Sequence, residues 1–169
     1  MPMRTILTFP DPVLRKTAKK VTTFDDELKQ LAMDMGETMY DAPGIGLAAN
    51  QIGVLLQIVV IDISATEEEK KFITLINPEI SDGQGCVTGE EGCLSVIEYM
   101  SNVDRYQKIK VNAQDLDGKP LEFEAEDHFA RVIQHEVDHL RGKLFIDRIS
   151  PLKRNLYKKK LKKILKSQS

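Results

Sequence analysis

The 169-residue sequence has no long hydrophobic run and contains only two cysteines and three histidines. Its longest apolar stretch, residues 52–61, is interrupted by Gln57, whereas a helix that spans a bilayer needs roughly 20 apolar residues. We therefore do not expect an integral membrane protein. The N-terminus also lacks the basic start and apolar core of a signal peptide. In a reducing compartment, two cysteines are expected as free thiols, ligands or nucleophiles rather than as a disulfide framework.

The sequence also has no large excess of charge of one sign. Its 24 basic and 26 acidic residues give a net charge of −2, which argues against a dedicated binder of DNA or RNA. The charge is unevenly distributed, because residues 151–169 hold eight basic groups and no acidic one, and the remainder carries −10. We expect one domain, with residues 1–150 as its body and residues 151–169 as a basic C-terminal helix. This helix either contacts an anionic partner or presents a solvated face.

Apolar spacing and turn residues predict an α+β fold with mostly antiparallel strands. The acidic residues 25–27 begin a helix with an apolar face that repeats every three or four positions, and Pro43-Gly44 ends it. A second helix is expected from Asp127 to about Arg141, and a third after Ser150-Pro151. Strands are expected at 54–63, 72–76, 108–115 and 121–123. Tyr157, Leu161, Ile164 and Leu165 are expected on one side of the last helix.

The second helix carries two histidines with the spacing of a metal site. His135 and His139 are four residues apart and lie on one face, so both imidazoles can reach one metal ion. Glu136 borders the same face and can touch a water at that ion without binding the metal itself. The alternative is an ordinary amphipathic helix with histidines placed by chance. A catalytic site would need a third protein ligand and one open position.

The third ligand is expected upstream of the two histidines. In the extended pattern His-Glu-x-x-His-x-x-Gly-x-x-His the last position is Phe145, which cannot bind metal, and no glutamate follows the pair. Cys93, in Glu90-Glu91-Gly92-Cys93-Leu94-Ser95, is the favoured candidate, and Cys86 and His128 are the alternatives. A cysteine with two histidines suits zinc or ferrous iron.

A segment of small residues, Gly44-Ile45-Gly46-Leu47-Ala48-Ala49-Asn50-Gln51, precedes the cysteine segment. It superficially matches a dinucleotide-binding fingerprint, but no strand is expected before it. Its glycines and alanines are expected to let the backbone run close to a ligand. Gln51 could supply an amide donor to an oxyanion.

Together these three segments resemble the peptide deformylase family, whose enzymes remove the N-formyl group from nascent polypeptides in bacteria and organelles. The family motifs Gly-x-Gly-x-Ala-Ala-x-Gln, Glu-Gly-Cys-x-Ser and His-Glu-x-x-His occur in this order at 44–51, 91–95 and 135–139. The resemblance extends to about residue 155. Asn50 and Ile97 depart from the family pattern, since both stand where proline is frequent.

The resemblance implies antiparallel sheets around a central metal-binding helix, with an N-terminal and a C-terminal helix. It implies Fe²⁺, replaceable by Zn²⁺, Ni²⁺ or Co²⁺, and the metal ligands Cys93, His135 and His139. Glu136 would be the general acid and base, and Gln51 and the backbone N–H of Leu94 would form an oxyanion hole. Arg105 would support the cysteine loop.

The resemblance also implies a cytoplasmic enzyme that acts on N-formylmethionyl nascent peptides and contacts the ribosome through its basic C-terminal helix. Ile45 and Gly46 would line the peptide cleft, and the pocket for the methionine side chain is expected to include Ile45, Val132 and Leu94. Two other functions compete with this one. The first is a metallopeptidase that uses the same two-histidine helix, and the second is a non-catalytic metal-binding or ribosome-binding module.

Overall fold

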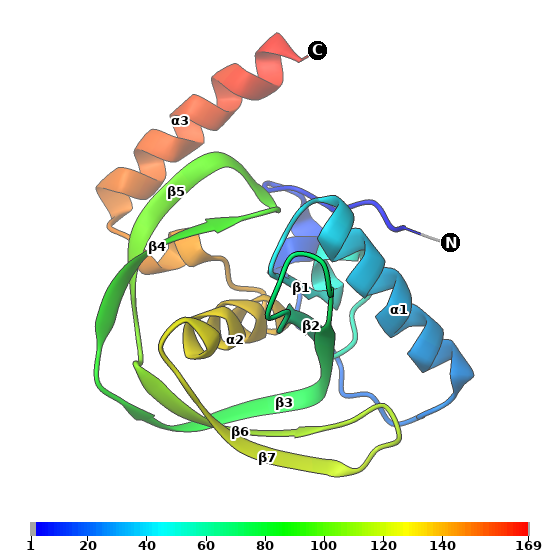
Figure 1. Cartoon of the computed structure of the whole chain (residues 1–169). Helices are drawn as coiled ribbons and strands as arrows, with labels where there is room; N and C mark the ends of the chain where they lie inside the picture. Colours follow the sequence, from blue (N-terminus) through cyan, green and yellow to red (C-terminus); the bar gives the residue numbers. More distant parts are fainter. Residues whose placement is uncertain (1–2, 169) are drawn as a thin grey trace.

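The computed structural model describes residues 3–168 and has two antiparallel sheets (Figure 1). Within this range the helices are α1 (Asp26–Asp41), α2 (Asp127–Leu140) and α3 (Pro151–Ser167), with the short 3₁₀ helices η1 (Pro12–Arg15), η2 (Ala49–Ile52) and η3 (Phe145–Arg148). The strands are β1 (Gly46–Ala48), β2 (Ile58–Asp62), β3 (Phe72–Gln84), β4 (Val87–Cys93), β5 (Val96–Arg105), β6 (Lys108–Gln114) and β7 (Pro120–Glu126). The larger sheet has the order β1-β2-β3-β6-β7, and β4 and β5 form the smaller one.

Helix α2 lies in the middle of the molecule, with β3, β6 and β7 on one side and the β4–β5 hairpin on another (Figure 1). Its apolar residues Ile133, Val137 and Leu140 are buried in a core cluster with side chains of the larger sheet. Packing on several sides also buries the polar residues in the second half of the helix, which are Gln134, His135, Glu136, Asp138 and His139. The predicted α+β fold, with antiparallel sheets around a central helix, is confirmed.

The ends of the helices follow local capping chemistry. The Asp25 side chain accepts a hydrogen bond from the Leu28 N–H and caps α1, and Ser150 caps α3 in the same way. Gly142, with φ of +75°, follows the end of α2. All three helices therefore lie where the sequence predicts them. None of the helices in residues 3–168 is long and apolar enough to cross a bilayer.

The predicted apolar side of α3 is only partly correct. Tyr157 and Leu161 are buried against the body, Ile164 is half-buried and Leu165 is exposed. Figure 1 shows the reason, because the last turns of α3 extend beyond the β4–β5 hairpin. The apolar spacing continues past the point where there is a surface to cover it.

The strands differ more from their predicted limits. Strand β2 begins at Ile58 rather than at residue 54, because Gly53 has φ of +81° and the Val54 N–H closes a turn onto Ala49. Strand β3 continues past the predicted end to Gln84. The β4–β5 hairpin was not predicted at all. Its sequence is interrupted by glycines and charged residues, so it lacks the alternation that marks a half-buried strand.

Candidate metal centre

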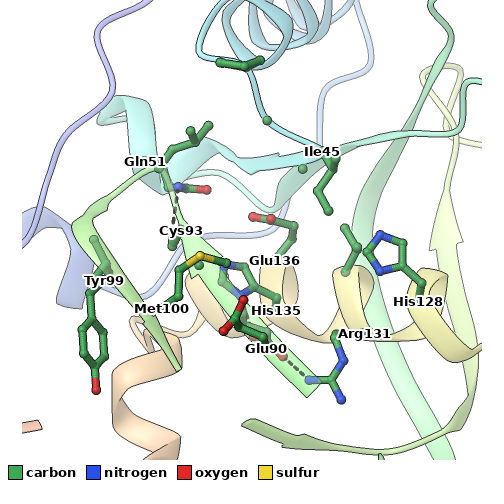
Figure 2. Close-up of a pocket in the computed structure, with 18 of the residues that line it drawn as sticks. Ile45, Gln51, Glu90, Cys93, Tyr99, Met100, His128, Arg131, His135 and Glu136 are labelled. Atoms are coloured by element: carbon green, nitrogen blue, oxygen red, sulfur yellow. Dashed lines mark hydrogen bonds and ion pairs between the residues drawn. The ribbon is translucent and has the colours of Figure 1, made fainter. Parts of the chain in front are cut away.

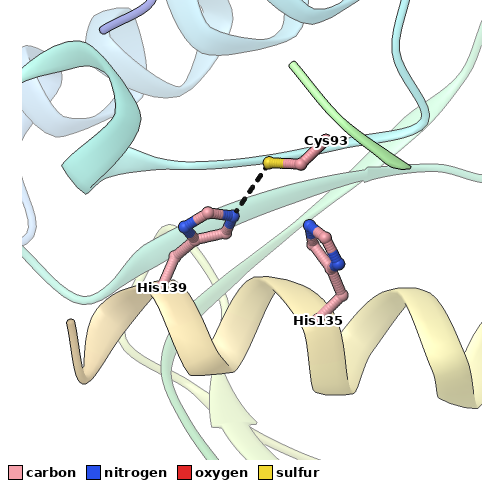
Figure 3. Close-up of side chains that lie close together, drawn as sticks. All are labelled: Cys93, His135 and His139. Atoms are coloured by element: carbon pink, nitrogen blue, oxygen red, sulfur yellow. Dashed lines mark hydrogen bonds between the residues drawn. The ribbon is translucent and has the colours of Figure 1, made fainter. Parts of the chain in front are cut away.

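Cys93 comes together in space with His135 and His139 of α2 (Figure 3). One ligand atom from each residue lies within 4.8 Å of those of the other two. The Cys93 sulfur is 3.4 Å from His139 Nε2, and the histidine ring centroids are 5.1 Å apart. Among residues 3–168 this is the group that could hold a metal ion, and it includes neither Cys86 nor His128. One soft sulfur and two imidazoles fit a zinc or ferrous ion.

Two elements that are distant in sequence bring these ligands together. The histidines lie four residues apart on α2 and therefore project from the same face. Cys93 is the last residue of β4, where the regular pairing with β5 shifts between Gly92 and Cys93. This shift in register ends the regular β4–β5 pairing at Cys93, so that its thiol lies next to α2. The sulfur also faces two donors, the Ser95 N–H at 3.4 Å and the Gln51 side-chain nitrogen at 3.6 Å.

Glu136 lies beside the three ligands, and the backbone of β1 runs across its carboxyl group. A Cβ added to Gly46 would lie 2.5 Å from Glu136 Oε2, so only glycine leaves room for the carboxylate where it stands. Within the described chain the buried Glu136 Oε1 has no hydrogen-bond partner. A buried polar atom without a partner is costly, and a ligand or water at the metal position would satisfy it.

Burial sets the protonation of Glu136 and His139 in the metal-free protein. It raises the pKa of Glu136 to about 7, because the charged carboxylate is cut off from water. It also lowers the pKa of His139 well below the usual value, and the adjacent His135 adds to this shift. His139 is therefore neutral near pH 7, which is the form that binds metal.

His135 behaves differently because anionic partners surround it. Burial alone would lower its pKa, but the Glu136 carboxylate and the bonds to Cys93 and Glu91 raise the pKa well above its usual value. Glu91 Oε1 lies 2.9 Å from His135 Nδ1. The raised pKa keeps a proton on both ring nitrogens near pH 7 in the metal-free protein. A metal that binds Nε2 must displace the proton there, while the carboxylate holds the one on Nδ1, a common arrangement behind metal-binding histidines.

Glu91 is the centre of a buried network of charges behind the ligands. Arg105 donates to both of its oxygens, at 2.8 and 2.9 Å, and Arg131 donates to Oε2 at 2.6 Å. Burial opposes the charge of Glu91, yet Arg105 and His135 hold the pKa of this carboxyl well below its usual range. A second buried carboxylate, Asp138, accepts from Arg105 at 2.7 Å and continues the network.

Gln51 lies on the other side of the metal group, at the end of the glycine-rich segment (Figure 2). Its side-chain oxygen accepts from the Ala48 N–H at 2.9 Å, and its nitrogen donates to Ser95 Oγ at 3.0 Å. These bonds direct the amide nitrogen toward Cys93, as Figure 2 shows. Gln51 is 1% exposed, so the orientation of its amide is well determined by its surroundings.

A cavity of about 520 Å³ opens directly onto this group. Its apolar wall includes Ile45, Leu94 and Val132, all of which the sequence analysis assigned to substrate binding. Gly46, Gln51, Cys93, His135 and Glu136 also line it. His139 does not line the cavity and is 1% exposed.

The favoured metal ligands therefore lie together, and the two alternative ligands, His128 and Cys86, do not join them. His128 is exposed near the start of α2 and lines the cavity mouth, while Cys86 is exposed at the β3–β4 turn. Sequence reasoning missed Glu91, Arg131 and Asp138 as parts of the site. For Arg131 a signal existed, since it is four residues before His135 and so lies on the ligand face of α2.

Comparisons with known proteins agree with this geometry. The family model described as Polypeptide deformylase matches residues 3–155. A peptide deformylase of Desulfotalea psychrophila is 55% identical over 159 residues, which cover 94% of each chain. The crystal structure of a peptide deformylase from Legionella pneumophila has a TM-score of 0.90 and 49% identity, and the match covers 98% of this chain and 97% of that one. A peptide deformylase from Synechococcus elongatus, solved in complex with actinonin, has a TM-score of 0.89 and 41% identity, with 95% and 88% covered.

Proposed function

The chain belongs to the polypeptide deformylase family, and from that premise we propose that Cys93, His135, His139 and Glu136 form its active centre. The reaction of the family is the hydrolytic removal of the N-formyl group from newly synthesised polypeptides, with release of formate. The observation that carries the assignment is the meeting of a thiol and two imidazoles within 4.8 Å, at the wall of the cavity that Glu136 also lines.

We propose Fe²⁺ as the bound ion, with Zn²⁺, Ni²⁺ or Co²⁺ as replacements. The ligand types support this choice, because thiolate and imidazole suit late first-row metals better than magnesium or calcium. Cys93, His135 and His139 would hold this divalent ion, which would act as a Lewis acid and lower the pKa of water toward about 7.

Glu136 is the group we assign to proton transfer. Its carboxyl group lines the cavity beside the three ligands, where it can accept a proton from the attacking water and return that proton to the departing amine. The free Oε1 faces no competing partner in the described chain. General acid–base catalysis of this kind is typically worth roughly 10²–10⁴ in rate.

Gln51 and the backbone N–H of Leu94 are proposed to stabilise the negative charge that develops on the formyl oxygen. The bonds from Ala48 and to Ser95 hold the Gln51 amide in place before substrate arrives. Such preorganised donors are worth on the order of 3 kcal/mol each in the transition state. The methionine side chain of the substrate is assigned to the apolar wall formed by Ile45, Leu94 and Val132.

A formate-release assay tests this function. The iron-loaded enzyme, prepared without oxygen, is given a formyl-methionyl peptide and, as the matched control, the same peptide without the formyl group. We expect formate from the first and no cleavage of the second. Cleavage of peptide bonds in the unformylated peptide would favour the metallopeptidase instead. In addition, Glu136→Ala should keep its metal and lose nearly all turnover, and an unchanged rate would remove Glu136 from the mechanism.

We further propose that α3 belongs to the same domain as residues 1–150 and that its basic face contacts ribosomal RNA in the cytoplasm. Tyr157 and Leu161 pack in one buried cluster with β5 and η3, which supports the first part. The second part is supported by exposed lysines: Lys158, Lys159, Lys162 and Lys163. Changing these four to glutamine should weaken ribosome binding and reduce its salt dependence. Binding that is unchanged at every salt concentration would refute this contact.

A further inference from the structure

Residues 7–18, which we call the N-terminal strap, run past all three segments that carry the proposed active centre. Three backbone hydrogen bonds join the strap to them: Leu7 N to Gln51 O at 2.7 Å, Phe9 N to Ser95 O at 2.7 Å, and Ala18 N to Leu140 O at 2.8 Å. The first acceptor is the backbone oxygen of Gln51, whose side chain is the proposed oxyanion donor. Ser95 lies two residues after Cys93, and Leu140 directly follows His139. One continuous stretch of chain thus spans segments that lie far apart in sequence.

The strap packs most tightly at the end of α2. A Cβ added to Gly142 would lie 2.4 Å from the carbonyl oxygen of Arg15, so the two backbones are in direct contact. Gly142 also has φ of +75°, which disfavours a side chain there in any case. This contact lies three residues beyond His139, so the strap packs against the backbone that follows the ligand helix.

The Arg15 side chain fastens the strap to the segment that follows α2. Its two terminal nitrogens donate to the two carboxylate oxygens of Asp147, at 2.5 and 3.0 Å. Asp147 in turn accepts from the Leu144 N–H at 3.0 Å and closes η3. Phe145, which follows Leu144, is 1% exposed and stacks on His135, with 6.0 Å between the ring centroids and 27° between the ring planes.

We infer that Arg15 is a positioning residue for the metal centre. Its bidentate pair with Asp147 holds η3 and the end of α2 against the strap, and this fixes the Phe145 ring behind His135. Bidentate arginine–carboxylate pairs set orientation as well as distance, so the pair is suited to this role. The inference rests on the proposed function only in taking Cys93, His135 and His139 as the metal ligands.

The rate of metal release tests this role without any measurement of activity. Protein loaded with Co²⁺ is mixed with excess chelator, and the decay of the thiolate-to-cobalt absorption band gives the rate. We expect Arg15→Leu to release cobalt about tenfold faster than the unaltered protein, as is typical when support behind a metal ligand is lost. Arg15→Lys keeps the positive charge but cannot form the bidentate pair, so its rate of cobalt release should lie between those of Arg15→Leu and the unaltered protein.

Arg4→Leu is the matched control. Arg4 also pairs with a carboxylate, and its side chain is 41% exposed against 38% for Arg15. Its two nitrogens approach a single oxygen of Asp34, at 3.3 and 3.4 Å, and the pair lies on α1 and not on the metal segments. Its release rate should stay within about twofold of the unaltered protein. The inference fails if Arg15→Leu also stays within about twofold, or if Arg4→Leu releases cobalt equally fast.

Two further outcomes remain distinguishable. If Arg15→Leu does not fold, Arg15→Lys and Asp147→Asn are compared in its place, and cobalt release at the unaltered rate in both overturns the role of Arg15. If the unaltered protein takes up no cobalt, the proposed metal centre itself is wrong and this inference fails with it. Cobalt uptake with unaltered release in the variants would refute only the positioning role.

Discussion

Gly46→Ala offers a direct test of where Glu136 must stand. Gly46 lies in β1, and its φ is not in the left-handed region, so alanine suits the backbone there. The added Cβ would lie 2.5 Å from Glu136 Oε2 and 2.9 Å from its Cγ. The three atoms nearest to the new Cβ all belong to Glu136, so the substitution acts on the proposed general acid–base group.

The size of the expected effect follows from these distances. Ordinary contact begins at 3.4 Å, so the Glu136 carboxylate must move by about 0.9 Å to relieve the overlap with the new methyl group. A misplacement of about 1 Å in a catalytic group can cost roughly 10²-fold in rate. We expect Gly46→Ala to lower kcat by about that factor while the metal content remains at one ion per chain.

Formate release under saturating substrate measures kcat, and elemental analysis measures the metal. Gly44→Ala is the control, because its added Cβ meets Leu94 Cδ1 at 2.7 Å, the far end of a side chain that can rotate away. It should lose at most about fivefold in kcat, since an off-rotamer side chain costs only about 1 kcal/mol, which is a factor of about five in rate.

A double variant separates displacement of Glu136 from general damage to the site. Glu136→Asp shortens the side chain, so it should lower kcat strongly when it is the only change. In the protein that already carries Gly46→Ala, which has displaced the carboxylate, the same change should lower kcat only slightly further. Fully additive losses, or Gly46→Ala with kcat within about threefold of normal, would refute the argument that the observed position of Glu136 is the working one.

Three further predictions concern the metal and the buried charges. Cys93→Ala should abolish stoichiometric metal binding in elemental analysis and Cys86→Ala should not; full occupancy in Cys93→Ala would contradict the ligand assignment. Because the pKa of Glu91 is lower in the folded than in the unfolded protein, its carboxylate stabilises the fold at pH values above the unfolded-state pKa near 4.5. This stabilisation is lost as the pH falls below that value. Urea unfolding of metal-free Glu91→Gln should therefore depend less on pH below about 5 than that of the unaltered protein, and equal dependence would count against the network. The raised pKa of Glu136 stabilises the folded metal-free protein below about pH 4.5, and this contribution is lost as pH rises through about 7. The free energy of unfolding of Glu136→Gln should therefore rise by about 2 kcal/mol relative to that of the unaltered protein as the pH is raised from 5 to 8. A difference between the two free energies that does not change with pH would refute this prediction.

The sequence predicted the helices better than the strands. Helix α2 is a clear case, because apolar spacing, the glycine that follows it and the His-Glu-x-x-His motif all lie within one short segment. The β4–β5 hairpin could not be recognised in the same way. Its strands are stabilised by pairing with each other and by Arg131, which donates to the backbone oxygens of Val87 and Val103. Neither contact has a local signature.

For the candidate site too, features within one segment could be predicted and contacts between distant segments could not. The three motifs were recognisable, and the residues proposed from them line one cavity or lie directly behind it. The partners of those residues were not recognisable. Glu91 and His135 are 44 positions apart, and nothing in the sequence around Glu91 indicates which histidine or arginine it meets.

By itself, the sequence determined the membership of the chain in its family, the central helix with the paired histidines His135 and His139, and the chemical types of side chain available at the site. These features depend on residue identity and on spacing within single segments, which the order of amino acids records directly. Only the tertiary structure decided that Glu91 orients His135, that Gly46 leaves room for Glu136, and that residues 7–18 join the three motif segments. Such contacts are set by packing between distant segments, and packing is a property of the whole chain.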